Sequence, residues 1–337
     1  METRKVQMSG GSTYTVSLPK TWAIEHGIEA GSVLFLHPQE NGTLQLTTDQ
    51  RSGAEKWKRT LSIGRLSPRQ IQNRLIALYA VGFGEITLQS SSEIDDTVRR
   101  TVTEATAGFT GLEVMEADSH SITLQNLAGA ENLDIRKSTL RLRLVTTSMY
   151  RDAVSALLED DSELAKSAIE RDAEADKLFA LLTRHFRRAI SSLEEVRQLG
   201  HNRQDIFEYY YVGRQLERVA DHAERIASLT VDVAATVPDE FHEEIESLAA
   251  HAQQSIDKAS KILLMSSDVE AGDRVLEECD ALLDEIATLD RTLYDHDEAA
   301  EAHLVGRLLD SLRRTVEYSQ NVARIVIQQS VRQVSDK

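Results

Sequence analysis

Two carboxylates four residues apart, Glu217 and Asp221, stand inside a long helical pattern, in the stretch ERVADHAERIA. On an α-helix such residues lie side by side on one face, where two like charges repel by about 0.2–0.5 kcal/mol. Two explanations are open for this arrangement. Either Arg214 and Arg225 neutralise the two carboxylates, or a cation bridges them.

A second carboxylate pair with the same spacing, Asp172 and Asp176, belongs to an internal repeat. The segment 162–182 resembles 269–289, and the two aspartates correspond to Asp280 and Asp284, each 108 residues later. A repeat of this length indicates a recurring structural unit.

The helix that carries ERVADHAERIA also has a counterpart, because 217–229 aligns with 313–327 at a shift of 96 residues. A shorter linker in the second repeat explains the smaller shift. Each repeat holds about three helices, so the sequence predicts two tandem three-helix bundles, at about 138–236 and 240–333.

The repeat resembles the PhoU family of phosphate-uptake regulators over about the last 200 residues. In that family, paired E/D-x-x-x-D motifs on facing helices hold a mono- or multinuclear metal cluster on each bundle. The resemblance implies a site in bundle one made of Asp172, Asp176, Glu217 and Asp221. It implies a second site in bundle two made of Asp280, Asp284 and Glu317. Arg313 stands there where bundle one has Glu217, so we expect the second site to be degenerate or empty.

Four carboxylates form a hard oxygen-ligand set, suited to Mg, Mn, Fe or Ca. We expect a divalent or trivalent ion, with Fe, Mn, Mg and Zn as candidates. The alternative is a pair of solvated helix faces, with Asp221 paired to Arg225 and Asp176 beside Lys177. His222 flanks the motif and has a side chain that can bind a metal, but we expect a solvent-facing or structural histidine there.

An enzyme, specifically a metal-dependent phosphohydrolase, is a further functional hypothesis, because clustered carboxylates with a metal can support phosphoryl hydrolysis. The sequence offers no phosphate-binding glycine loop and no nucleophile with a paired base. We therefore expect a protein that is not an enzyme.

Composition limits the remaining possibilities. The 337 residues include 38 Lys+Arg and 55 Asp+Glu, for a net charge of −17. The single cysteine, Cys279, excludes an internal disulfide and a cysteine-based zinc site. No apolar run approaches the roughly 20 residues of a membrane span, so we expect a soluble, cytoplasmic protein without membrane insertion.

The charge is concentrated in the helical region, where residues 138–337 carry 24 Lys+Arg against 39 Asp+Glu. A basic domain that binds nucleic acid by bulk charge is therefore excluded, and any DNA contact must come from a local patch.

The first 50 residues have the pattern of short strands and turns. KVQMSGGSTYTVSLP indicates two strands around Gly10 and Gly11, with Tyr14, Val16 and Leu18 alternating inward. PKTWAIEHGI predicts a short helix, and SVLFLHPQENGTLQLTTD a hairpin with an Asn-Gly turn. A segment this small buries too little surface to be stable alone, so we expect it to pair with a second copy.

This segment, numbered 1–50, resembles the AbrB-type swapped-hairpin DNA-binding domain through RKVQ, YTVSLPKTWA, GIEAGSVLFL and NGTLQL in that order. In that family two chains interleave their hairpins and basic surface residues contact DNA. The resemblance implies Arg4, Lys5 and Lys20 as DNA contacts. The alternative is a module that dimerises without binding DNA.

Residues 51–137 predict a small α/β unit with the element order β-α-β-α-β-β, compatible with a two-layer sandwich. Ser67 and Pro68 are typical of the start of its first helix. Its sequence does not indicate whether it is a connector or a ligand-sensing domain.

The sequence thus predicts a multidomain protein: a small all-β swapped-hairpin domain, a small α/β unit and an all-α region at 138–337. It resembles an archaeal-type AbrB–PhoU fusion. The resemblance implies a homodimeric or larger DNA-binding regulator that relays phosphate status to transcription or to a phosphate ABC-transporter subunit or another signalling protein. A PhoU-like interaction protein that does not bind DNA is the alternative.

Overall fold

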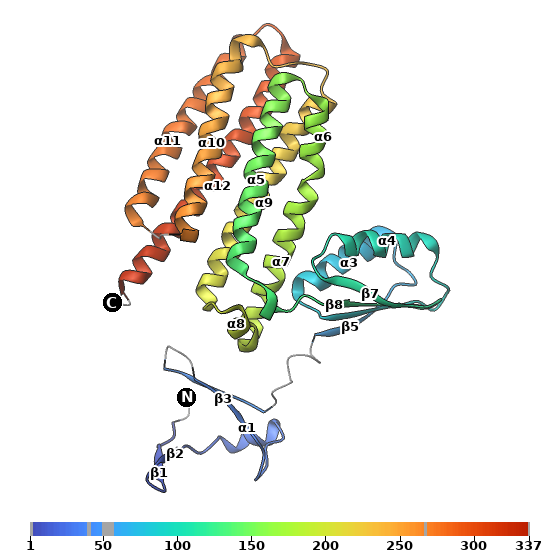
Figure 1. Ribbon diagram of the computed structural model, residues 1–337, viewed down its shortest axis with the longest axis vertical. Coiled ribbons are helices and arrows are strands. Elements are labelled where there is room, and N and C mark those ends of the chain that lie inside the picture. The colour runs from blue at the N-terminus through green and yellow to red at the C-terminus, as the bar shows by residue number, and fades with distance from the viewer. Residues whose placement is uncertain (1–2, 39–41, 49–56, 266–267, 336–337) are drawn as a thin grey trace. The chain divides into compact units, whose positions relative to one another are not determined.

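The computed structural model describes residues 3–38, 42–48, 57–265 and 268–335. The chain divides into two compact units, Met1–Trp57 and Lys58–Lys337 (Figure 1). No helix of the described residues is long and apolar enough to cross a membrane.

The N-terminal unit consists of two short antiparallel ribbons and one short helix. Its elements are β1 (Gln7–Ser9), β2 (Thr13–Thr15), α1 (Lys20–Glu25), β3 (Phe35–Pro38) and β4 (Leu44–Thr47). Met8 is paired with Tyr14 across β1 and β2, and Leu36 with Leu46 across β3 and β4. Gly10 and Gly11 take left-handed φ angles between β1 and β2, as a tight turn requires. The predicted strands, helix and hairpins are confirmed, although Asn41 of the second turn lies outside the described residues.

The apolar side chains of this unit are not covered within one chain. None of its described residues is buried. The large hydrophobic side chains that are 51–72% exposed are Val6, Met8, Tyr14, Val16, Ile24, Val33, Leu36 and Leu44. The expectation that Tyr14 and Val16 point into a core is wrong for a single chain, because ribbons of three or four residues provide no second layer to cover them.

The α/β unit has the predicted order of elements. They are β5 (Lys58–Ser62), α3 (Pro68–Val81), β6 (Glu85–Gln89), α4 (Asp96–Ala107), β7 (Leu112–Ala117) and β8 (Ser121–Asn126). The sheet order is β5-β6-β8-β7, with β5 and β6 parallel and the other pairs antiparallel. Helices α3 and α4 cover one face of the sheet (Figure 1). Ser67 and Gln70 form a capping box at the start of α3.

The helical region contains two bundles side by side (Figure 1). Bundle one consists of α5 (Ile135–Glu159), α6 (Ser162–Glu170), α7 (Asp172–Ser191), α8 (Leu193–Leu199) and α9 (Arg203–Asp232). Bundle two consists of α10 (Asp239–Met265), α11 (Val269–Thr292) and α12 (Ala299–Ser335). Helix α9 packs against α12 and α5 against α10, and one hydrophobic core runs through both bundles.

Two features of α7 position the candidate site. The helix begins at Asp172, directly after Arg171, whose guanidinium binds Asp152 at 2.6 Å and the Ser148 hydroxyl at 3.0 Å. Further along, the buried Arg184 donates to the backbone oxygens of Tyr79 and Phe83, each at 2.9 Å. These contacts fix the α/β unit to the helix that carries two of the predicted carboxylates.

Candidate metal centre

Neighbouring helices of bundle one, α7 and α9, bring three of the predicted carboxylates together. Asp172 is the first residue of α7, Asp176 stands one turn later, and Asp221 lies on α9. One carboxylate oxygen from each of these aspartates lies within 4.8 Å of the other two. We call Asp172, Asp176 and Asp221 the aspartate cluster.

Burial makes the carboxyl groups of this cluster hold protons more tightly than usual. It raises the pKa of Asp172 to about 7, and the charges of Asp176 and Glu224 add to the effect. Burial also raises the pKa values of Asp176 and Asp221. The Oδ1 atom of Asp172 is buried and has no hydrogen-bond partner among the described residues. An unpartnered, buried acceptor among like charges is stabilised by a proton or by a cation, so the cluster fits a bound metal ion.

Glu217, the fourth predicted ligand, lies beside the aspartate cluster and is held by an arginine. The Nη1 atom of Arg214 donates to both carboxylate oxygens of Glu217, each at 3.1 Å. Burial, followed by the charge of Asp221, still raises the pKa of Glu217 to about 7. The negative charge of Asp221 therefore acts on Glu217, and the carboxylate oxygens of Glu217 already have Arg214 as a cationic partner.

The other cations proposed for neutralisation do not bind the aspartates directly. Arg225 makes no ion pair with Asp221 within the described residues, although its charge opposes the rise in the pKa of that carboxyl group. Lys177, next to Asp176 in sequence, donates instead to the backbone oxygen of Ala107 at 3.0 Å. Direct neutralisation by an arginine thus accounts for Glu217, whereas the aspartate cluster lacks such a partner in the described part of the chain.

One acidic residue of the site was missed in the sequence. Glu224 lies three residues after Asp221 on α9, and its charge raises the pKa values of both Asp172 and Asp176. Its i,i+3 spacing from Asp221 places both on one helix face, and this signal could have identified it.

His222 faces away from the aspartate cluster. Its ring is 5% exposed and lies 5.9 Å from the ring of Tyr318 on α12. Burial lowers the pKa of His222 to about 4, so the imidazole is neutral at neutral pH. His222 therefore packs in the interface with bundle two and is not a ligand of the aspartate cluster.

Bundle two replaces the acidic arrangement by hydrogen bonds. Asp280, the counterpart of Asp172, accepts a hydrogen bond from the Gln320 amide at 2.7 Å. The shift of 96 residues places Gln320 at the position of Glu224. Glu317 accepts from Arg314 at 2.9 Å. Within the described residues, Asp280, Asp284 and Glu317 form no cluster of converging carboxylate oxygens. An amide that donates to Asp280 makes a cation there unnecessary.

The unpartnered Asp172 gives a first prediction about stability. In chelator-treated protein, Asp172→Asn should raise the melting temperature at pH 8 by roughly 2–4 °C, which corresponds to on the order of 1 kcal/mol after allowance for solvent screening. The folded-state pKa of Asp172 is raised to about 7, so its ionisation destabilises the fold above that pH. The gain should shrink as the pH falls from 7 toward the ordinary aspartate pKa of 3.8, below which the carboxyl group is mostly protonated in both states.

Thermal melts at pH 8 and pH 5 provide the measurement. Asp280→Asn is the matched control, because Asp280 already has the Gln320 amide as a partner and should gain no stability. Equal melting temperatures for Asp172→Asn and wild-type protein at pH 8 would contradict the assigned repulsion.

The cations predicted to contact DNA lie in the N-terminal unit. Arg4, Lys5 and Lys20 are all exposed, and Lys20 is the first residue of α1. Their exposure permits contact with a phosphate backbone.

Comparisons with known proteins agree with the two resemblances. The family model of the PhoU domain matches residues 139–230. A second family model, described as antidote-toxin recognition MazE, bacterial antitoxin, matches residues 7–53. The chain thus joins an N-terminal segment of the MazE/AbrB type to a PhoU domain, which confirms the predicted fusion.

Two solved structures are similar to part of the chain. PhoU from Pseudomonas aeruginosa is 23% identical, with 59% of this chain and 96% of that chain covered and a TM-score of 0.48. The phosphate transport system regulatory protein PhoU from Streptococcus pneumoniae is 14% identical, with coverages of 57% and 91% and a TM-score of 0.47. The comparison with curated proteins gave no match.

Proposed function

We propose that this chain is a DNA-binding regulator of phosphate uptake, in which a dimeric N-terminal unit binds DNA and a PhoU-like helical body relays phosphate status. The observation that carries the proposal is the presence of both domain types on one chain, at residues 7–53 and 139–230. A transcription regulator needs a DNA-contacting part and a part that receives a signal, and this pairing supplies a candidate for each.

The helical body is the proposed receiving part. The PhoU domain at residues 139–230 supports a phosphate-transporter subunit or a related signalling protein as its partner. A metal ion bound by the aspartate cluster would stabilise the start of α7 and the facing turn of α9. In this role the metal is structural, and the protein acts by binding rather than by catalysis.

Promoter binding tests the proposal directly. Gel-shift titrations should show tighter binding to promoter fragments of phosphate-transport genes than to an unrelated promoter of equal length, across a series of salt concentrations. Deletion of the gene should change transcript levels of the transport genes in phosphate-rich medium. Equal affinity for both promoters together with unchanged transcripts would leave the alternative, an interaction protein that does not regulate transcription.

The exposed apolar residues of the N-terminal unit predict that this unit dimerises. Leu36→Asp should convert the protein from a dimer to a monomer, because the Leu36 side chain is 58% exposed in one chain and a charge there cannot be buried in an interface. Light scattering of the full-length protein measures the change in mass.

Met115→Asp is the matched control for this prediction. Met115 is 50% exposed on β7 of the α/β unit, so the same charge is introduced outside the N-terminal unit, and the mass should stay that of a dimer. A monomeric wild-type protein, or a Leu36→Asp protein that remains dimeric, would rule out dimerisation through this surface.

A further inference from the structure

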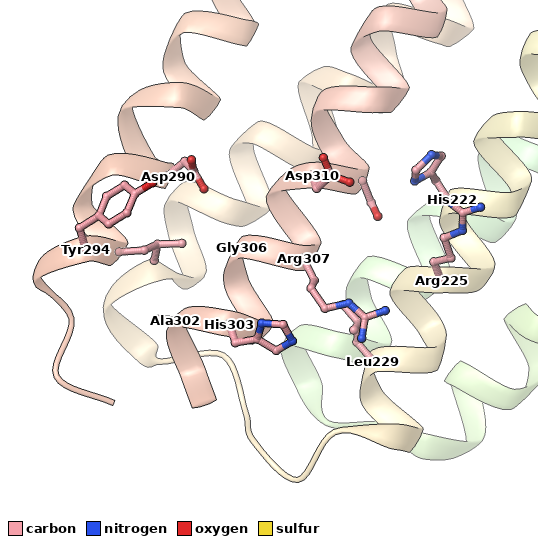
Figure 2. Close-up of a pocket in the computed structure, with 12 residues that line it drawn as sticks. His222, Arg225, Leu229, Asp290, Tyr294, Ala302, His303, Gly306, Arg307 and Asp310 are labelled. Atoms are coloured by element: carbon pink, nitrogen blue, oxygen red, sulfur yellow. The ribbon is translucent and has the colours of Figure 1, made fainter. Parts of the chain in front are cut away.

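A cavity of about 760 Å³ lies between the two bundles, at a place where α9 faces the end of α11 and the start of α12 (Figure 2). From α9 it is lined by His222, Arg225 and Leu229, whereas the aspartate cluster is formed with α7. The cavity is therefore separate from the candidate metal centre. Its size is within the range of about 300–1,000 Å³ that is typical of small-molecule sites.

Two arginines line this cavity from opposite bundles. Arg225 comes from α9 and extends toward His222, and Arg307 comes from α12 and extends toward Leu229, as Figure 2 shows. Within the part of the chain that the structure describes, neither makes an ion pair or a hydrogen bond, although the protein has 55 acidic residues against 38 basic ones. A guanidinium binds an oxyanion through two parallel hydrogen bonds. Two guanidinium groups without carboxylate partners therefore favour an anionic ligand.

One of the two acidic residues that line the cavity is already paired. Asp310 lines the cavity and forms an ion pair with Arg313, one turn later on α12. Its charge is thus compensated from outside the cavity, and the two arginines keep their capacity for a ligand.

The lining also contains a buried imidazole. His222 lines the cavity, is 5% exposed, and its Nδ1 atom is buried without a hydrogen-bond partner among the described residues. The Nδ1 atom is closed to the cavity, so His222 contributes the remainder of its ring to the wall. His303 adds a second, exposed imidazole from α12 (Figure 2).

The rest of the cavity is suited to an organic group. Leu229, Leu293 and Tyr294 provide apolar walls, and Asp290 at the far side can accept hydrogen bonds from hydroxyl or amino groups (Figure 2). Gly306 lies inside α12, where a glycine is about 1 kcal/mol less favourable than alanine. A Cβ atom added at Gly306 would meet only Leu293, at 3.8 Å, so this glycine leaves open space. A bare oxyanion would fill a small part of the cavity.

We propose that this cavity binds a small organic phosphate, with its phosphoryl group between Arg225 and Arg307 and its organic part against Leu229, Leu293 and Tyr294. Such a ligand would join bundle one to bundle two through the two arginines. The site is new with respect to the proposed function, and it depends neither on a bound metal nor on DNA.

Calorimetric titration of the full-length protein at constant ionic strength tests the proposal. The probes are adenosine 5′-monophosphate, glucose 6-phosphate, inorganic phosphate, and adenosine and glucose as phosphate-free controls. At least one of the two esters should bind saturably and more tightly than inorganic phosphate, while adenosine and glucose should not bind. Arg307→Ala should weaken that binding about tenfold or more, because a charge-assisted hydrogen bond is lost.

Arg307 is the cleaner substitution, because Arg225 also acts on Asp221. Arg291→Ala is the matched control: Arg291 lies next to Asp290 on α11, bonds within its own helix, and does not line the cavity. Gly306→Met fills the space while both arginines remain, and it should abolish binding of the ester. Methionine is a better helix former than glycine, so this variant should keep its fold, which circular dichroism verifies.

Three results would overturn the proposal. They are the absence of saturable binding by both esters, an affinity that Arg307→Ala leaves unchanged, and inorganic phosphate binding as tightly as the better ester. The last result would show that the space beyond the phosphoryl group is not used. None of these results concerns promoter binding, so the proposed regulatory function is tested independently of the cavity.

Discussion

Protein in which Asp172 and Asp221 are both replaced by asparagine is expected to purify without the metal ion of bundle one. Wild-type protein is expected to retain enough metal after dialysis to fill about one site per chain. The two residues come from different helices and contribute oxygens within 4.8 Å of each other. Replacing both removes two of the three charges that a hard cation requires from this ligand set. Elemental analysis of dialysed protein gives the metal content and identifies the metal.

Two matched variants make this prediction specific. Glu217→Gln should retain most of the metal, because Arg214 already holds both oxygens of Glu217. Asp280→Asn combined with Asp284→Asn makes the same chemical change in bundle two and should leave the metal content unaltered. If the first double variant keeps its metal, the ion is bound elsewhere. If wild-type protein contains none, protons stabilise the aspartate cluster.

The helices and the pairing of carboxylates could be predicted because both depend on spacing along the chain. Apolar residues recur at helical intervals in the last 200 residues, and Asp172 and Asp176 share one face of one helix. The resemblance to the PhoU family implied which second helix faces them. Asp221 lies on that helix, and the fold assembles the three aspartates accordingly.

The state of each carboxylate could not be predicted in the same way. Whether Glu217 binds a metal or an arginine depends on the conformation of Arg214, one turn away on the same helix. In bundle two the sequence has Arg313 where bundle one has Glu217, yet the residue that satisfies Asp280 is Gln320. A hydrogen bond between α11 and α12 depends on their axial offset, which the period of the sequence leaves open.

The cavity between the bundles illustrates the same limit. Arg225 and Arg307 belong to helices of different repeats, and each alone has the pattern of an ordinary exposed arginine. Their shared cavity follows from the packing of α9 against α12. Similarly, the alternation of Tyr14 and Val16 predicted an apolar face correctly, but the sequence of one chain could not show that nothing in that chain covers it.

Replacement of both Arg4 and Lys5 by alanine is expected to produce the largest change in DNA binding. The chain has a net charge of −17, so binding must rest on a few cations of the N-terminal unit, doubled in a dimer. Three cations per chain make at most about six phosphate contacts, and each contributes roughly 0.9 to the slope of log K against log salt concentration. The magnitude of the slope should therefore be at most about 5–6 for wild-type protein and fall to about 2 for the double variant.

The loss should be similar for all DNA sequences, because phosphate contacts position a protein without specifying bases. Affinities for one phosphate-transport promoter and one unrelated promoter, measured at several salt concentrations, separate this effect from a loss of specificity. Arg65→Ala combined with Arg69→Ala removes the same charge from exposed positions of the α/β unit and should leave the slope unchanged. If instead this control flattens the slope and Arg4→Ala with Lys5→Ala does not, the DNA-binding surface belongs to the α/β unit, and the N-terminal unit serves dimerisation.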